Sequence, residues 1–230
     1  MKKEHCYFLQ GDDDKYDICI IHGFKSRKER KKGLAKVLNS KGYNVLCCDL
    51  IGHGTRKKEG TYTKVFDSLL ELEDIIKQNG RKMVLIGHSM GGAIALSLGI
   101  RNPEVEKIFA IGAPYGRMND RKDRMLKLSL LLRTDFLNAS EEGYRQILRV
   151  MPMVYGECKM VDPNRFYLIY TKNDGFVEYN EFLRNKDMLC VPDKNILLYK
   201  FITGNGELDH ILIGNDSRTI DFILKNLGDE

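Results

Sequence analysis

One short run in this 230-residue chain has the residue types and spacing that nucleophilic chemistry needs. Residues 87–91 have the sequence Gly-His-Ser-Met-Gly, with an apolar, β-favouring segment before them at 82–86 and a small-residue, helix-permissive segment after them at 92–98. This order predicts a strand, a sharp turn and a helix, with glycines where the two backbones pass within a side chain's width. Ser89 would then lie at the apex, facing the helix N-terminus, which presents a weak nucleophile to an acyl group.

Segments of strand and helix character alternate around this run and must position it. The apolar pattern predicts strands near residues 5–9, 17–21, 43–48, 82–87, 105–111, 165–171 and 195–201. It predicts helices near residues 27–41, 64–79, 90–101, 176–185 and 211–227. Gly42 and Gly80 are expected to stop the first two helices. The alternation predicts an α/β protein with a mostly parallel central sheet of about seven strands and helices on both faces.

The alternation breaks between residues 115 and 160. This segment is rich in methionine, has a strongly apolar stretch at 126–132, and is about twice as long as one crossover helix needs. It forms either one more packing helix or a small helical cap that lines an apolar pocket. We favour the cap, inserted after the fifth strand of a core made of residues 1–114 and 161–230. Its candidate substrate-binding residues are Met118, Met125, Met151 and Met153.

Bulk composition excludes several classes of protein. The 37 basic and 32 acidic residues give a net charge of +5, which is too small to indicate nucleic-acid binding. The six cysteines form no C-x-x-C motif and have no zinc-ligand spacing, so we expect reduced thiols, no metal and a cytoplasmic location. The chain has no apolar run typical of a signal peptide and no stretch long enough to span a membrane. Composition leaves the oligomeric state open.

Two further motifs follow predicted strands. Residues 22–24, His-Gly-Phe, come after the strand at 17–21, and residues 49–54, Asp-Leu-Ile-Gly-His-Gly, come after the next strand. Together with the run at 87–91 they stand in the order found in the α/β-hydrolase superfamily, and the chain resembles that superfamily over nearly its whole length. It is most similar to the small serine carboxylesterases, the monoacylglycerol lipases and the cinnamoyl or feruloyl esterases. The resemblance implies the α/β-hydrolase fold.

The same resemblance implies a base and an acid for Ser89. In this superfamily the serine, the acid and the histidine follow one another along the chain, and only His210 lies downstream of Ser89, in a predicted flexible loop. Asp174 follows the strand at 165–171 and matches the pattern G-x-x-D-x-x-V, except that Thr171 replaces the glycine. The other candidates for the acid are Asp162, Asp187, Asp193 and Asp209.

Acyl transfer also needs N–H donors for the oxyanion. The backbone N–H of Met90, directly after the nucleophile, is one expected donor, and the resemblance implies the backbone N–H of Phe24 as the second. Side chains in the three motifs are expected to stabilise their turns rather than transfer protons: His22, Asp49, His53 and His88.

A basic run at 25–32 follows the His-Gly-Phe motif. It is either the solvated face of the first helix or a surface that attracts an anionic substrate or lipid headgroups, with weak contact to a membrane surface. The two alternatives remain open at this point.

These residues together imply a serine hydrolase that cleaves small-molecule carboxylic esters through an acyl-enzyme on Ser89. The apolar cap composition suggests a short or medium acyl chain or an aromatic acyl group. The reaction needs no cofactor and no metal. The alternatives are an acyltransferase or a cofactor-free peroxidase that uses the same site, or a non-catalytic ligand-binding protein of the same fold.

Overall fold

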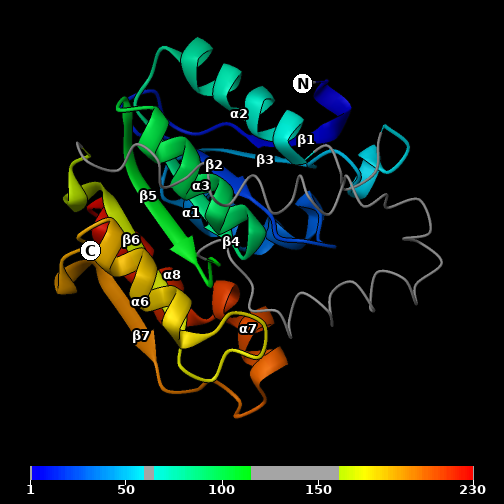
Figure 1. The fold of residues 1–230 in the computed structure, drawn as a ribbon. Helices are drawn as coiled ribbons and strands as arrows, with labels where there is room; N and C mark the ends of the chain where they lie inside the picture. Colours follow the sequence, from blue (N-terminus) through cyan, green and yellow to red (C-terminus); the bar gives the residue numbers. More distant parts are fainter. Residues whose placement is uncertain (1, 60–64, 115–160, 230) are drawn as a thin grey trace.

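A mostly parallel β-sheet forms the centre of the molecule (Figure 1). The structure, a computed structural model, describes residues 2–59, 65–114 and 161–229. Within them one sheet has the strand order β1-β3-β2-β4-β5-β6-β7. Its strands are β1 (Cys6–Leu9), β2 (Asp17–Ile21), β3 (Asn44–Cys48), β4 (Met83–His88), β5 (Val105–Ile111), β6 (Phe166–Thr171) and β7 (Ile196–Tyr199). Only β1 pairs antiparallel, with β3, and the predicted mostly parallel sheet is confirmed.

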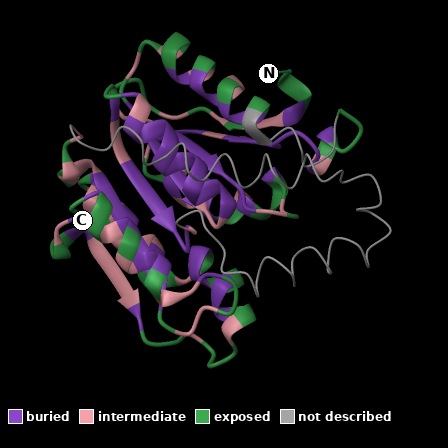
Figure 2. Ribbon diagram, in the orientation of Figure 1, coloured by how far each residue is buried: buried purple, intermediate pink, exposed green. Residues whose placement is uncertain are grey.

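Helices cover both faces of the sheet (Figure 1). The helices of the first face are α2 (Val65–Asn79), α3 (Met90–Arg101) and α6 (Tyr179–Met188), which share a hydrophobic core with one set of strand side chains. Helices α1 (Lys32–Ser40) and α8 (Ser217–Leu227) share a second core with the other set. Figure 2 shows buried residues along the strands and on the inward sides of these helices.

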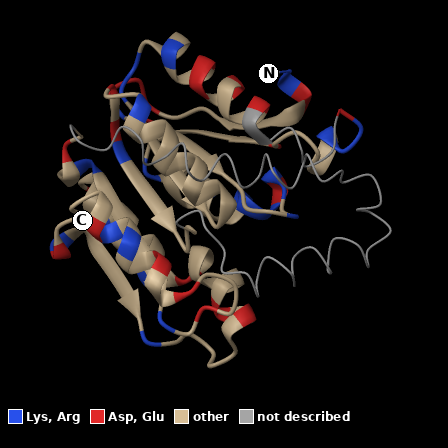
Figure 3. Ribbon diagram, in the orientation of Figure 1, with Lys and Arg blue, Asp and Glu red and all other residues tan. Residues whose placement is uncertain are grey.

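The strands between β3 and β7 are buried on both faces. On β4, Val84 and Ile86 pack into one core while Leu85 packs into the other, and all three are at most 1% exposed. Truncation of such a side chain to alanine typically costs about 2–5 kcal/mol, so each strand is held firmly in register. Charged residues lie mainly on the helices and in the loops, and few lie on the central strands (Figure 3). The carboxyl ends of the parallel strands therefore form a rigid edge on which a site can be built.

The predicted helix at 211–227 is wrong as a single element. The structure has α7 (Gly206–Leu212), a 3₁₀ turn over Ile213–Asn215, and then α8. Asp216 begins α8 as its N-cap, because its side chain accepts the backbone N–H of Arg218. Asn205 begins α7 in the same way, by accepting the N–H groups of Glu207 and Leu208. His210 thus lies on a short helix and not in a flexible loop.

Two other helices begin later than expected. The segment Lys28–Lys31 is a 3₁₀ turn that precedes α1, because the backbone N–H of Lys28 donates to the buried Asp49 carboxylate. Helix α6 begins after Glu178, whose side chain forms a reciprocal capping box with Glu181. The Gly42 and Gly80 helix stops agree with the structure, where both glycines have positive φ.

Among the described residues, no helix has both the length and the apolarity needed to cross a membrane. The expected cap at 115–160, with Met118, Met125, Met151 and Met153, lies outside the described residues, and so the division into core and cap stays a prediction.

Candidate active site

Ser89 occupies a strained turn between β4 and α3, called here the Ser89 turn (residues 87–91). Its backbone has φ +55° and ψ −124°, a conformation that L-residues rarely adopt. A Cβ atom on Gly87 would overlap the carbonyl oxygen of Gly91, and one on Gly91 would overlap the carbonyl oxygen of Ile21. The two glycines are therefore required by close backbone approach, as the sequence pattern predicts.

A histidine–carboxylate pair lies at the same edge of the sheet. His210 Nδ1 is 2.6 Å from Asp174 Oδ2, and the two side chains are 7% and 1% exposed. Asp174 Oδ1 accepts the backbone N–H groups of Phe176 and Val177, both at 2.8 Å. Because a carboxylate accepts hydrogen bonds, Nδ1 carries the proton and Nε2 is left as the acceptor nitrogen of the neutral imidazole.

The end of β5 connects the Ser89 turn to this pair. The Ser89 N–H donates to the Ile111 carbonyl at 2.8 Å. The next residue, Gly112, has φ +53°, and a Cβ atom there would be 3.3 Å from His210 Nδ1 and 3.5 Å from Asp174 Oδ2. One short segment, residues 111–112, thus borders both the Ser89 backbone and the His210–Asp174 pair, which places the Ser89 turn and the pair at the same end of the sheet.

His88 supports the backbone of His210. Its Nε2 donates to the His210 carbonyl oxygen at 2.8 Å, and the two imidazole ring centroids are 5.1 Å apart. Burial, together with the positive charge of Lys31 and the neighbouring His210, holds the pKa of His88 well below its ordinary value. His88 is therefore neutral, and its Nε2–H is committed to holding the helix that carries His210. Sequence reasoning expected a structural residue here but gave no indication of this partner.

The His-Gly-Phe loop runs against the Ser89 turn. A Cβ atom on Gly23 would be 2.9 Å from the His88 carbonyl oxygen and 3.0 Å from Ser89 Cβ. Phe24 follows directly in this loop, and Met90 is the first residue of α3, where backbone N–H groups have no helical carbonyl to bond. The two expected oxyanion donors thus belong to the two segments that flank Ser89.

His22 holds this loop in place. Its Nδ1 donates to the Gly23 carbonyl at 2.8 Å, and its Nε2 accepts the Leu50 N–H at 3.1 Å. Burial lowers the pKa of His22 to about 4, so the ring is neutral and can fill both hydrogen-bonding roles. Both of its ring nitrogens are engaged by the backbone, which leaves none for proton transfer.

Asp49 binds two neighbouring segments through buried hydrogen bonds. Asp49 is fully buried, accepts the Lys28 N–H at 2.8 Å and pairs with Lys28 Nζ at 2.7 Å, and it also bonds Thr55. Burial would raise the pKa of this carboxyl, but the bonds from Lys28 and Thr55 outweigh that effect and hold the pKa below its ordinary value. The solvated-face interpretation of the basic run is wrong for Lys28 and Lys31, which are both buried. In a sequence, such inward-pointing lysines look like any other surface cations.

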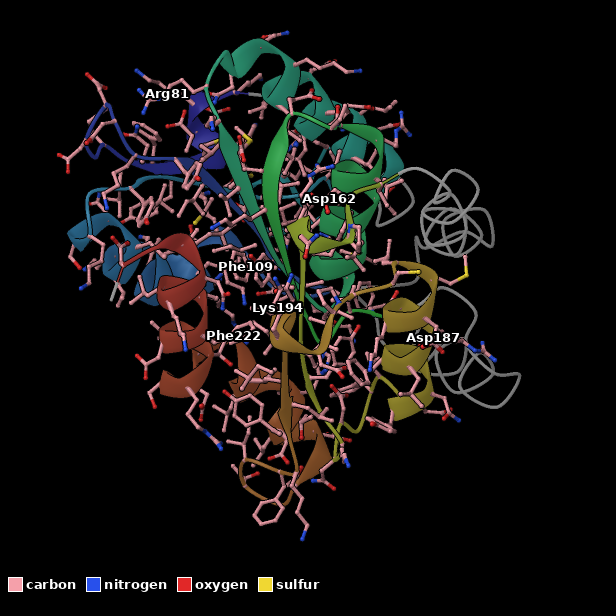
Figure 4. All side chains as sticks on the ribbon, turned by 90° about the vertical axis from the view of Figure 1, so that its left-hand side faces the viewer. Arg81, Phe109, Asp162, Asp187, Lys194 and Phe222 are labelled. Atoms are coloured by element: carbon pink, nitrogen blue, oxygen red, sulfur yellow. The ribbon has the colours of Figure 1, made fainter. Side chains whose placement is uncertain are left out.

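The rival acids are placed elsewhere. Asp162 caps the turn before β6, Asp187 is exposed on α6, and Asp193 is 87% exposed and paired with Lys186; Figure 4 labels Asp162 and Asp187 on their separate elements. Asp209 is buried beside His210, but its carboxylate accepts the Thr203 N–H and hydroxyl, the Ile202 N–H and the Asn173 side chain.

Asp209 is a residue whose role the sequence did not reveal. Burial would raise its pKa, but the bonds from Thr203, Asn173 and Ile202 lower the pKa to about 2. Asn173 directly precedes Asp174, so the Asp209 carboxylate ties the helix of the base to the turn of the acid. A further backbone bond, from the Gly175 N–H to the Gly206 carbonyl at 2.9 Å, joins the same two segments. Among the described residues, no group of three or more His, Cys, Asp or Glu side chains is placed to hold a metal ion.

Known proteins resemble this arrangement in sequence and in fold. The chain is 24% identical over 206 residues to the monoacylglycerol lipase abhd6-B of Xenopus laevis, an alignment that covers 83% of this chain. The chain spans only 58% of the length of that relative. The solved monoacylglycerol lipase of Paleococcus ferrophilus superposes with a TM-score of 0.70 at 17% identity, over 96% of this chain and 98% of the other.

A second solved structure, Est1E of Butyrivibrio proteoclasticus with bound ferulic acid, superposes with a TM-score of 0.63 at 17% identity, over 97% of this chain and 95% of the other. At these identities the likeness shows the α/β-hydrolase fold. The family model described as "Serine aminopeptidase, S33" matches residues 12–146, which is more than half of the chain. With its fold, its Ser89 turn and this match in agreement, the chain belongs to the serine aminopeptidase S33 family of α/β hydrolases.

Proposed function

We propose that this protein is a serine hydrolase that cleaves small-molecule carboxylic esters, with Ser89 as nucleophile, His210 as base and Asp174 as the acid that orients it. The observation that carries the proposal is the 2.6 Å hydrogen bond from His210 Nδ1 to Asp174, which leaves Nε2 as a proton acceptor beside the Ser89 turn. The monoacylglycerol lipases among the relatives support an ester as substrate.

The proposed reaction has two steps. His210 Nε2 takes the Ser89 proton as the hydroxyl oxygen attacks the ester carbonyl, and the backbone N–H groups of Phe24 and Met90 hold the oxyanion. Asp174 stabilises the imidazolium that forms. The imidazolium then protonates the leaving alcohol, and a water molecule that gives its proton to His210 hydrolyses the acyl-enzyme.

Two described neighbours of His210 carry no charge. Among the described residues that contact the His210 ring or main chain, His88 is held neutral by burial, and Phe176 is apolar, with its ring centroid 5.1 Å from that of His210. The imidazolium is then stabilised chiefly by Asp174, which is the condition under which the acid contributes most to the rate. We propose a short or medium acyl chain or an aromatic acyl group as the acyl part.

A panel of p-nitrophenyl esters of graded chain length, a monoacylglycerol and a feruloyl ester tests this proposal. Ser89→Ala should lower kcat by at least about 10³-fold on every substrate that the wild type cleaves. Ser97→Ala is the matched control, because the buried Ser97 hydroxyl on α3 has no hydrogen-bond partner among the described residues. It should leave kcat within about two-fold of the wild type.

The same assay separates the remaining candidate functions. If an added alcohol or peroxide captured most of the acyl group, the protein would be an acyltransferase or a cofactor-free peroxidase. If folded wild-type protein gave neither turnover nor a burst with an activated ester, the catalytic assignment would be wrong and a ligand-binding role would replace it.

A further inference from the structure

Two cysteines face each other at the edge of the sheet, on strands β1 and β3, which carry none of the residues of the proposed reaction. Cys6 on β1 and Cys48 on β3 are direct partners in the antiparallel register. Their Sγ atoms are 2.8 Å apart in a thiol–thiol hydrogen bond, and both cysteines are free. No motif in the sequence indicates this pairing, because 41 residues separate the two positions.

The backbone at this pair has the geometry of a cross-strand disulfide. The Asp49 N–H donates to the His5 carbonyl at 2.9 Å, which makes His5 and Asp49 a hydrogen-bonded pair. Hydrogen-bonded and non-hydrogen-bonded pairs alternate along an antiparallel ladder, so Cys6 and Cys48 form a non-hydrogen-bonded pair, in which Cα atoms approach to about 4.5 Å. That spacing lies inside the range of Cα distances that disulfides span.

The two thiols differ in the way that exchange chemistry requires. Cys6 is half-buried and within reach of solvent, and its pKa is lowered by its hydrogen bond with the Cys48 thiol and by the charges of Lys28 and Arg56. Cys48 is buried, and its bond to Cys6 and its burial raise its pKa. Cys6 therefore has the features of an attacking thiolate and Cys48 those of a resolving thiol.

The other described strand cysteines have no such partner or access. Cys19 and Cys47 are both buried, and burial raises the pKa of Cys19 to about 12 and also raises the pKa of Cys47. Cys47 is paired with Tyr7 across the same ladder, and its side chain belongs to the core beneath helices α1 and α8. It is therefore a matched control, because it is one residue from Cys48 but faces the other side of the sheet.

We propose that Cys6 and Cys48 form a reversible dithiol–disulfide site that exchanges with low-molecular-weight disulfides such as glutathione disulfide. The Cys6 thiolate attacks one sulfur of glutathione disulfide, which forms a mixed disulfide and releases one glutathione thiolate. Cys48 loses its proton to solvent, attacks the Cys6 sulfur and releases the second glutathione. The two protein thiols are oxidised by two electrons, and one glutathione disulfide is reduced to two thiols.

The bond would fasten the edge strand to the rest of the sheet. Among the described strands β1 pairs with β3 alone, so its place in the sheet depends on this ladder. Closing a loop of this length removes freedom from the unfolded chain and should raise the Tm by several degrees. The effect concerns the fold and not Ser89, so it can be tested whether or not the protein hydrolyses esters.

Redox titration of the full-length native protein tests the proposal. The protein is equilibrated in glutathione buffers of increasing oxidised fraction, quenched with acid, alkylated and mapped by peptide mass spectrometry. We expect an intramolecular Cys6–Cys48 link that appears as the buffer becomes oxidising and disappears on reduction, together with the rise in Tm. A chain that acquires only glutathione adducts, or links that involve other cysteines, would overturn the proposal.

Two substitutions test the roles of the thiols. Cys48→Ser keeps a hydrogen-bond donor but cannot resolve, so a stable glutathione adduct should accumulate on Cys6. Cys48→Ala removes the donor, so alkylation of Cys6 by iodoacetamide at pH 7 should slow several-fold relative to Cys48→Ser. In Cys47→Ser the Cys6–Cys48 link should form as in the wild type. Equal alkylation rates in the two Cys48 variants would contradict the proposed activation of Cys6.

Discussion

Replacing Asp174 by asparagine changes a single atom, and the structure determines how the new amide must orient. The amide oxygen can keep both bonds from the Phe176 and Val177 N–H groups, each 2.8 Å long in the native protein. The amide NH₂ then faces His210 Nδ1, which is 2.6 Å from the native carboxylate. The reverse orientation loses two backbone hydrogen bonds of about 1 kcal/mol each and places donor against donor.

The amide therefore forces the imidazole proton onto Nε2. Nε2 then has no lone pair for the Ser89 proton, and the loss should approach the roughly 10⁴-fold fall in kcat, about 5.5 kcal/mol, that a wrong histidine tautomer produces in serine hydrolases. KM should change little, because Asp174 is 1% exposed and lies behind the imidazole. The assay is kcat and KM for a p-nitrophenyl ester between pH 6 and 9, with circular dichroism and Tm to verify folding.

Asp187→Asn is the matched control, since Asp187 is an exposed aspartate on α6, and its kcat should stay within about two-fold of the wild type. If folded Asp174→Asn kept kcat within ten-fold of the wild type, Asp174 would not orient the base. One of the rival aspartates, Asp209 first, would then have to be tested.

Two further predictions concern stability. Burial lowers the pKa of His22 to about 4 and that of His53 to about 3, while both rings titrate near 6.5 in the unfolded chain, which therefore binds more protons below that pH. The free energy of unfolding should thus fall by about 2–3 kcal/mol for each ring between pH 7 and 4.5, and urea titrations that gave equal stability at both pH values would contradict these buried neutral rings. Gly91→Ala should destabilise the protein by about 3 kcal/mol, because the added Cβ overlaps backbone carbonyl oxygens. Gly33 lies on the exposed face of α1, where an added Cβ would have no atom within 4 Å, so Gly33→Ala should stabilise the protein by about 0.5–1 kcal/mol. Similar thermal shifts for the two alanine variants would show that close approach does not explain Gly91.

Strand and helix positions were predictable where one physical signal dominated. The apolar strands at the sheet centre alternate in burial between two cores, so a short apolar run bounded by charge was a sufficient signal for β4. The Ser89 turn was predictable because only glycine fits where the strand and helix backbones nearly touch.

The errors had two sources, local helix caps and contacts between distant residues. Asp216 caps α8 and divides the last predicted helix, and Asn205 caps α7, which begins before that helix was expected. Both caps were within reach of sequence reasoning, because Asn and Asp are favoured at helix starts. The burial of the Lys28 side chain was not predictable, because its partner Asp49 is 21 residues away in the sequence and contacts it only in the folded protein. The His88–His210 contact spans 122 positions and leaves no local pattern.

Trapping the acyl-enzyme tests the central claim most directly. Wild-type protein would be mixed with an activated ester or a fluorophosphonate, quenched within milliseconds to minutes, and examined by intact and peptide mass spectrometry. We predict one adduct per chain, located on Ser89, formed much more slowly in His210→Ala and absent in Ser89→Ala. An adduct on another residue, or ester hydrolysis that persists in folded Ser89→Ala, would contradict the account.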